Sequence, residues 1–538
     1  MGKTLALVIA ILAVVLGPVV LRPRGDSSAL RGQDTLTVIT PHNEAIRSEF
    51  GEAFREWYRK KTGRTVLLQW LTPGGTSEIY RYLEGAYAAG FENHWRGKLG
   101  RTWNNDAQQG FMDSKTVLAA SPAEDTARQA SRRAFLASGI TSNIDIFFGG
   151  GAYDFQKAAG AGMLTDCGYV REHPGLFGIG KPIPPIVGGE RYYDEGGLWV
   201  GTTIGAFGIA SNRDQLARRG LPEPRTWADL ADPRYFRSLA LANPTQSSSS
   251  NKAFEMLIQQ QMNLTATERS RDDATTTAEG WQRAMRLIQR ISANARYFSD
   301  SSAKIALDIE AGEATAGMTI DFYGRFQSET VRRADGSSRI RYSDAEGGTS
   351  YGVDPIALLR GAPHPELAHA FIEFVMGDGQ KLWAYRAGEP GGPRHHSLRR
   401  LPILPELYTE AHRAHRGDPD VLPYEAAKHF SYDGKRTGPL FGTIAFTVRV
   451  MCIDPHRELT AAWRALCDAK ERTGHFPPEA LAAFEDVAHV DYAIASGRIR
   501  KALSEGESKI EQVRLAKELA DRFRNNYERA EQLAREGK

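Results

Sequence analysis

Alternating apolar runs and polar turns over residues 34–90 predict the order strand, helix, strand, helix. Residues 35–40 are rich in β-branched side chains, and the helix after them carries Ile46, Phe50 and Phe54 on one face. That helix ends at Gly63, and a second strand over 65–71 leads into another helix. This order is typical of a parallel α/β sheet.

The pattern is interrupted by a polar stretch over about 91–135, which we interpret as an insertion. It resumes with a buried strand over 143–148, three glycines and a helix. A glycine-rich strand over 198–211 is suited to cross between two lobes. Shorter strands are expected at 237–242, 314–320 and 351–359, each next to a helix.

Strand signals become scarce from about residue 396, and helical periodicity continues to the end of the chain. We therefore expect an α/β fold with this division: lobe 1 over 34–204, lobe 2 over 205–350, a return to lobe 1 over 351–395, and a helical extension over 396–538. In the last helix, Ala516, Phe523 and Tyr527 share one face. That face either packs on the α/β body or docks a partner.

The N-terminal segment 1–33 indicates export. Residues 4–21 carry no charge, and Arg22 and Arg24 follow in a polar linker. A run of this length suits either a cleaved signal peptide or an uncleaved membrane anchor. The rest of the chain is expected in the periplasm or at the cell envelope, and anchoring by residues 4–21 is the open alternative.

The charge balance argues against a nucleic-acid partner. The 538 residues include 68 Lys and Arg against 65 Asp and Glu, a net charge of +3. Three cysteines, Cys167, Cys452 and Cys467, exclude a disulfide framework. Cys452 and Cys467 are the nearest pair if any bridge forms.

Polar loops recur where a predicted strand ends and a helix begins, which is the ligand-binding edge of an open α/β sheet. Small residues there leave backbone N–H groups free, and the helix dipole adds partial positive charge, so an anion is favoured. Ordinary turn and capping chemistry is the alternative for each loop. The candidate ligand-binding residues in these loops and in the crossing strand are Thr72, Gly74, Gly75, Thr76, Ser77, Gly150, Gly151, Thr203, Asn243, Thr245, Ser247 and Ser248.

Three further candidates are His42 in the first loop and Asp321 and Tyr323 in a loop of the second half. Each also has a structural interpretation, as a turn residue, a helix cap or a packed ring. The chain has no Gly-x-Ser-x-Gly elbow, no Walker loop and no His-Glu-x-x-His motif. We therefore predict a binding protein with no catalytic residues and no cofactor.

Several segments resemble the bacterial extracellular solute-binding proteins of ABC transporters, in particular the iron(III)-type branch. The segments are TLTVITPHNEAIRSEFGEAFREWYRKKTG, IDIFFGGGAYDFQKAAGAGML, PRTWADLADPRYFRSLALANPTQSSSS, AGEATAGMTIDFYGRFQ and HPELAHAFIEFVMGDGQKLW, which fall within about 35–390. The resemblance implies a two-lobed type 2 periplasmic-binding fold that closes around a small ligand. It also implies delivery of that ligand to a permease in the cytoplasmic membrane.

Ferric binders of that family use a histidine in the first loop and two adjacent tyrosines in the second lobe. His42 matches the histidine, but Phe322 and Tyr323 stand at the positions of the two tyrosines, so only one tyrosine is kept. His42 and Tyr323 are thus the metal ligands if the cargo is Fe(III), and the loss of one phenolate argues against it. The glycine- and serine-rich helix starts favour a small anionic, phosphate-bearing ligand. The alternative is a membrane-anchored ligand sensor or interaction protein that reuses the binding fold.

Overall fold

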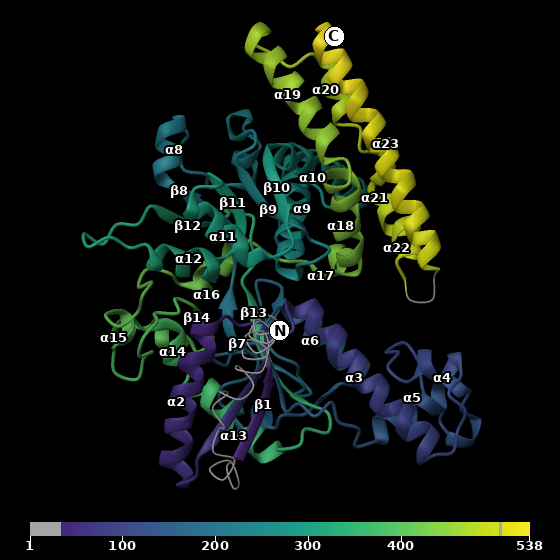
Figure 1. Ribbon diagram of the computed structural model, residues 1–538, viewed down its shortest axis with the longest axis vertical. Helices are drawn as coiled ribbons and strands as arrows, with labels where there is room; N and C mark the ends of the chain where they lie inside the picture. The colour runs from purple at the N-terminus through teal and green to yellow at the C-terminus, as the bar shows by residue number, and fades with distance from the viewer. Residues whose placement is uncertain (1–33, 505–507) are drawn as a thin grey trace, which may run out of the picture.

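The computed structural model describes residues 34–504 and 508–538, in which two β-sheets form the centres of two lobes (Figure 1). The sheet of lobe 1 has the order β14-β7-β13-β3-β1-β2, with β4 paired to β13. Its strands are β1 (Asp34–Ile39), β2 (Val66–Leu71), β3 (Ile146–Phe148), β4 (Leu164–Thr165), β7 (Val200–Gly205), β13 (Gly352–Leu359) and β14 (Leu401–Pro402). β1 runs parallel to β2 and β3, and β13 is antiparallel to β3 and β7, so the sheet is mixed.

The sheet of lobe 2 has the order β10-β9-β11-β8-β12. Its strands are β8 (Phe207–Asn212), β9 (Leu239–Ala242), β10 (Ala295–Ser299), β11 (Ala316–Ile320) and β12 (Ile340–Asp344). β9 is parallel to β10 and β11, whereas β8 is antiparallel to β11 and β12. A separate hairpin pairs β5 (Ile186–Val187) with β6 (Glu190–Arg191).

The chain crosses between the two sheets twice. Only Ala206 separates β7 from β8, and residues 345–351 lead from β12 back to β13. The long strand expected over 198–211 is therefore two strands that belong to different sheets. Two sheets joined by two crossings confirm the predicted two-lobed α/β fold, an arrangement that permits hinge motion.

Local sequence signals account for the helices of lobe 1. α2 (Glu44–Thr62) begins where the Asn43 side chain accepts a hydrogen bond from the Ile46 N–H, and it ends at Gly63 in the left-handed conformation. Its buried face places Phe50 and Phe54 against α13 (Pro365–Met376). α3 (Thr76–Gly97) and α6 (Ala152–Ala161) complete the helices that border the site described below.

The expected insertion forms a small helical unit at the far end of α3. It contains α4 (Asn105–Gly110), η1 (Pro122–Glu124) and α5 (Ala127–Ala137). Phe91 of α3 stacks on Phe111, with ring centroids 5.0 Å apart, and both rings meet Phe135 of α5. This aromatic core fixes the insertion to lobe 1.

Helices cover lobe 2 and continue into the C-terminal extension. Two long helices of lobe 2, α9 (Ser248–Arg269) and α10 (Ala274–Asn294), pack on each other. The extension contributes α18 (Phe441–Val448), the π-helical turn Arg449–Ile453, α19 (His456–Thr473), α20 (Pro478–Phe484) and α23 (Lys509–Glu536). Phe523 and Tyr527 of α23 are buried in the core of lobe 2, so the last helix packs on the body of the protein.

The extension divides between the lobes, unlike the single segment expected from residue 396. Leu401, Ile403 and Leu407 belong to the core of lobe 1, and β14 pairs with β7 of its sheet. From Phe430 onward most of the buried apolar residues belong to the core of lobe 2. The apolar run after residue 400 was too short to predict this pairing, which depends on a partner strand about 200 residues away.

Candidate functional site

Two helices of lobe 1 begin side by side without side-chain caps. Gly75 precedes α3 and Gly151 precedes α6, and neither offers a side chain to the free N–H groups of the first turn. Gly150 has φ 103°, and a Cβ there would lie 2.4 Å from the Thr76 hydroxyl oxygen. Only glycine permits this approach, which brings the two helix starts together.

A helix of lobe 2 meets these starts from the opposite side. The Oγ atoms of Ser77 in α3 and Ser248 in α9 lie 2.7 Å apart, and the Ser248 hydroxyl donates to Asp154 Oδ2 of α6 at 3.1 Å. We call Ser77, Asp154 and Ser248 the helix-start cluster. Burial raises the pKa of Asp154 to about 6, although the hydrogen bond from Ser248 and the charge of Lys157 lower it.

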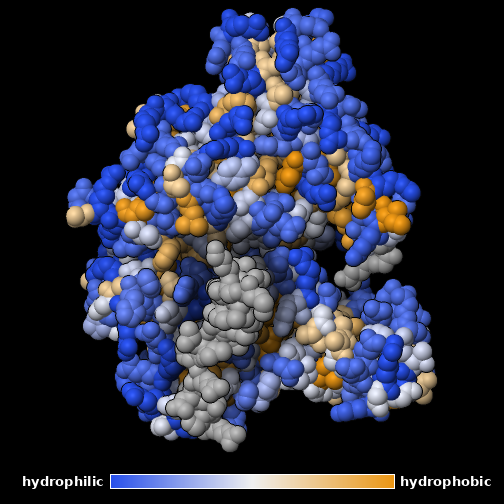
Figure 2. All heavy atoms as spheres, in the orientation of Figure 1, coloured by the Kyte–Doolittle hydropathy of each residue, from blue (hydrophilic) through white to orange (hydrophobic). Residues whose placement is uncertain are grey.

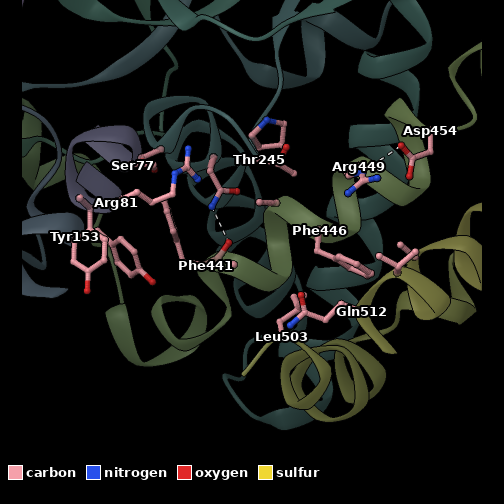
Figure 3. Close-up of a pocket in the computed structure, with 18 of the residues that line it drawn as sticks. Ser77, Arg81, Tyr153, Thr245, Phe441, Phe446, Arg449, Asp454, Leu503 and Gln512 are labelled. Atoms are coloured by element: carbon pink, nitrogen blue, oxygen red, sulfur yellow. Dashed lines mark hydrogen bonds and ion pairs between the residues drawn. The ribbon is translucent and has the colours of Figure 1, made fainter. Parts of the chain in front are cut away.

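The helix-start cluster borders a cavity of about 860 Å³ (Figure 3). We call it the extension cavity, because lobe 1, lobe 2 and the extension all contribute to its wall. Helices of the lobes supply mainly polar groups, and the extension supplies most of the apolar ones. The lining residues used below are Ser77, Asp154, Lys157, Thr245, Ser248, Asn251, Phe441, Ala445, Phe446, Leu503, Val513, Ala516 and Ala520.

His42 lies buried at the loop after β1, in contact with an arginine that the sequence reasoning missed. Its Nε2 is 3.3 Å from Arg400 Nη1, and its ring meets Phe148 edge-on at 4.6 Å. Gly149 passes so close that a Cβ there would fall 2.3 Å from the imidazole. Burial, together with the charges of Arg400 and Arg47, holds the pKa of His42 well below its usual range, so the ring is neutral at pH 7.

Arg400 is fully buried between the lobes. It forms an ion pair with Asp354 of β13, and its guanidinium lies 4.1 Å from the Phe322 ring centroid and 5.2 Å from that of Trp383. We call His42, Phe322, Asp354 and Arg400 the arginine cluster. In the sequence, the burial of Arg400 is indicated only by the apolar run 401–404 that follows it directly.

Asp321 and Tyr323 lie at the start of α12 (Asp321–Thr330), on the lobe 2 side of the arginine cluster. Burial raises the pKa of Asp321 to about 7, opposed by the charges of Arg325 and Arg400. Burial also raises the pKa of Tyr323 to about 12, and Arg400 again opposes the shift. Both side chains are therefore close enough to Arg400 to sense its charge.

The other predicted residues take several different positions. The Thr203 hydroxyl donates to the Leu401 carbonyl at 2.6 Å, inside the sheet. Asn243 accepts hydrogen bonds from both the N–H and the hydroxyl of Thr245, which stabilise the turn before α9, and Ser247 caps that helix. Thr72 and Gly74 lie exposed in the loop before α3.

Within the described residues, no three His, Cys, Asp or Glu side chains are grouped to hold a metal ion. Cys167, Cys452 and Cys467 are all free thiols. Over 34–504 and 508–538, no helix is long and apolar enough to cross a membrane. The apolar run 4–21, predicted as signal peptide or anchor, lies outside the described residues.

Residues 145–393 match the family model described as bacterial extracellular solute-binding protein. This match agrees with the resemblance to extracellular solute-binding proteins that the sequence segments indicate. It spans the last part of the first lobe 1 segment, the 205–350 segment of lobe 2 and nearly all of the return to lobe 1.

Two curated relatives match parts of this chain, and each match covers only part of the relative. The phosphoglycerate transport regulatory protein PgtC of Salmonella typhimurium is 28% identical over 188 residues, which are 34% of this chain and 40% of PgtC. An uncharacterized protein of Haemophilus influenzae is 24% identical over 251 residues, 46% of this chain and 62% of that protein. The chain thus spans less than two thirds of the relatives that it matches.

Solved structures of periplasmic binding proteins are also similar. AfuA of Actinobacillus pleuropneumoniae, with fructose-6-phosphate bound, has a TM-score of 0.45 and 14% identity, covering 75% of this chain and 96% of AfuA. Iron-bound HitA of Pseudomonas aeruginosa has a TM-score of 0.43 and 15% identity, covering 77% of this chain and 99% of HitA.

Proposed function

We propose that this chain is the exported receptor of an ABC importer and that it captures a small phosphate-bearing anion between its lobes. The observation that carries the proposal is the meeting of the uncapped starts of α3 and α6 with the serine-rich start of α9. Free N–H groups and the dipoles of three helices favour a polyanionic group at this point. The ligand would then be delivered to a permease in the cytoplasmic membrane.

In the helix-start cluster the two hydroxyls suit a phosphate, and Asp154 can share a proton with it because burial raises the pKa of this carboxyl to about 6. Ser77 and Ser248 come from opposite lobes, so one group that binds both hydroxyls would hold the lobes together. Lys157 supplies a cation at the same cavity, with its Nζ 4.0 Å from the centre of the Tyr80 ring. The name of the relative PgtC, which refers to phosphoglycerate, supports a phosphorylated small molecule.

The arginine cluster disfavours ferric ion as the cargo. Arg400 lies 3.3 Å from His42 and close to Tyr323, so a permanent positive charge stands beside both expected ferric ligands. Phe322 occupies the place of a second phenolate and packs against the guanidinium. A trivalent cation would meet repulsion and too few oxygen donors.

Isothermal titration of the purified chain tests the proposal. We expect binding of 3-phosphoglycerate, glycerol 3-phosphate or fructose 6-phosphate, and none of Fe(III). Ser77→Ala and Ser248→Ala should each weaken binding about tenfold or more, since a hydrogen bond to a charged group contributes about 1.5–3 kcal/mol. Ser249→Ala is the matched control, because Ser249 follows in the same helix turn and does not line the cavity.

Two results would contradict the proposal. Tight Fe(III) binding that is lost in Tyr323→Phe would assign the site to a metal cargo. Phosphate binding that is equal in the Ser77, Ser248 and Ser249 variants would remove the helix-start cluster from the site.

A further inference from the structure

The extension cavity has two chemically different walls. Lobes 1 and 2 supply the hydroxyls of Ser77, Thr245 and Ser248 and the ammonium of Lys157. The extension supplies apolar side chains, which are Phe441, Ala445, Phe446, Leu503, Val513, Ala516 and Ala520. Figure 3 shows Phe446 and Leu503 on the extension side and Ser77 on the opposite side.

The charged groups on the extension side are already paired with one another. Arg449 lies 3.3 Å from Asp454, and Asp521 accepts from Lys517 at 2.7 Å and from Arg524 at 2.6 Å. On the lobe side, no carboxylate of the described residues lies within ion-pair distance of Lys157, although its charge is near enough to lower the pKa of Asp154. The lobe side of the cavity therefore offers hydroxyls and the cation of Lys157 beside the carboxyls of Asp154 and Glu84, and the extension side offers apolar side chains among charged groups that are already paired.

One buried polar atom in the wall has no partner in the described part of the chain. Asn251, 1% exposed, donates through Nδ2 to the Phe441 carbonyl at 2.7 Å, and its Oδ1 accepts nothing. A buried acceptor of this kind costs free energy unless a donor reaches it. A hydroxyl of a ligand in the cavity would supply that donor.

An apolar side chain also stands exposed at the cavity. Val513 of α23 lines it and is 69% exposed. Val513 and Ile510 are both exposed in the first two turns of α23. Figure 2 shows hydrophobic side chains on the surface near the lower end of this helix. The volume of about 860 Å³ is in the upper part of the range of about 300–1,000 Å³ typical of small-molecule pockets, well above what a bare phosphate fills.

We infer that the cargo is an amphiphilic phosphate monoester, with its phosphate at the helix-start cluster and an apolar group against the extension. This inference rests on the proposed function and adds the second half of the ligand. The extension thereby becomes part of the binding site, and Phe446 and Val513 become determinants of specificity.

Calorimetric titration with ethyl, butyl and hexyl phosphate tests the inference on the full chain. Each methylene that is buried against the extension should tighten binding about fourfold, which corresponds to about 0.8 kcal/mol per CH₂. Val513→Asn should reduce the gain from ethyl to hexyl phosphate at least fivefold and leave ethyl phosphate binding within twofold. Ile510→Asn is the matched control, since Ile510 is 70% exposed on the same helix and does not line the cavity.

The outcomes separate this inference from the proposed function. If hexyl phosphate binds no more tightly than ethyl phosphate, the apolar subsite is refuted and the phosphate site stands. If the gain falls equally in the Val513 and Ile510 variants, the apolar group lies outside the extension cavity and the inference is wrong. If no phosphate ester binds at all, the proposed function is refuted, and the inference that rests on it is refuted with it.

Discussion

Asp154→Asn should stabilise the protein at neutral pH and have much less effect in acid. Asp154 is 4% exposed, and its pKa is raised from 3.8 to about 6 by burial. The folded protein therefore holds a proton that the unfolded chain releases between these two values. The protonated form of Asp154 stabilises the fold, and this stabilisation is lost as pH rises through the window. Above pH 6 the loss of unfolding free energy is complete, because the buried carboxyl is then ionised.

The size of this cost follows from the shift. A rise of about two units corresponds to about 3 kcal/mol at pH 7.5, and to about 1 kcal/mol at pH 4.5, where the carboxyl is still largely protonated in the fold. Asparagine carries no charge at either pH, and its amide can still accept from Ser248. The variant should thus gain about 2 kcal/mol of unfolding free energy relative to wild type between pH 4.5 and 7.5.

Urea unfolding at the two pH values, followed by tryptophan fluorescence, measures this difference. Asp300→Asn is the control, because Asp300 is exposed at the surface of lobe 2. An Asp154 variant whose pH dependence matches that of the Asp300 variant would refute the reasoning. It would mean that the carboxylate is solvated and that the lobes do not enclose it.

Three other substitutions test the packing between the lobes by thermal or urea unfolding. Arg400→Met should destabilise the protein by about 3–5 kcal/mol, because it leaves Asp354 buried without its partner, and Arg400→Met with Asp354→Asn should recover part of this loss. Gly189→Ala should strongly lower the unfolding free energy, since the residue has φ 83° and a Cβ would lie 1.8 Å from the Tyr432 carbonyl oxygen. A variant with wild-type stability would contradict this geometry. Lys252→Met should cost about 3–5 kcal/mol because two largely buried glutamates at 3.0 and 3.1 Å lose their cation, and unchanged stability would show that these groups are solvated.

Much of the fold could be predicted because local patterns determine it. The alternation of apolar runs and helices over 34–90 predicted β1, α2, β2 and α3 within a few residues. The glycine-rich run 198–211 predicted the crossing, but its break at Ala206 depends on which sheet each half joins, and that is a long-range property. The division of the extension between two cores is long-range in the same way.

The helix starts of the candidate site were also predictable, because glycine and serine are favoured directly before a helix. Their convergence was not, since Ser77 and Ser248 are separated by 171 positions. The burial of Arg400 was indicated only weakly, by the apolar run 401–404 that follows it. A lone arginine in a loop is normally solvated, and the sheet pairing of Leu401 carries this one into the interior.

The extension contacts both lobes, so a ligand bound in the extension cavity would be linked to their relative position. Phe441 is bound to lobe 2 through the hydrogen bond from Asn251, and its ring lies 4.5 Å from that of Tyr153 in lobe 1. The lobes are connected at Ala206, at 345–351 and through the extension before Phe430. Any rotation about these connections that separates Ser77 from Ser248 also moves the apolar wall away from lobe 1. A cargo that contacts both walls therefore binds the closed arrangement more tightly than the open one, and its apolar half adds directly to the free energy of closure.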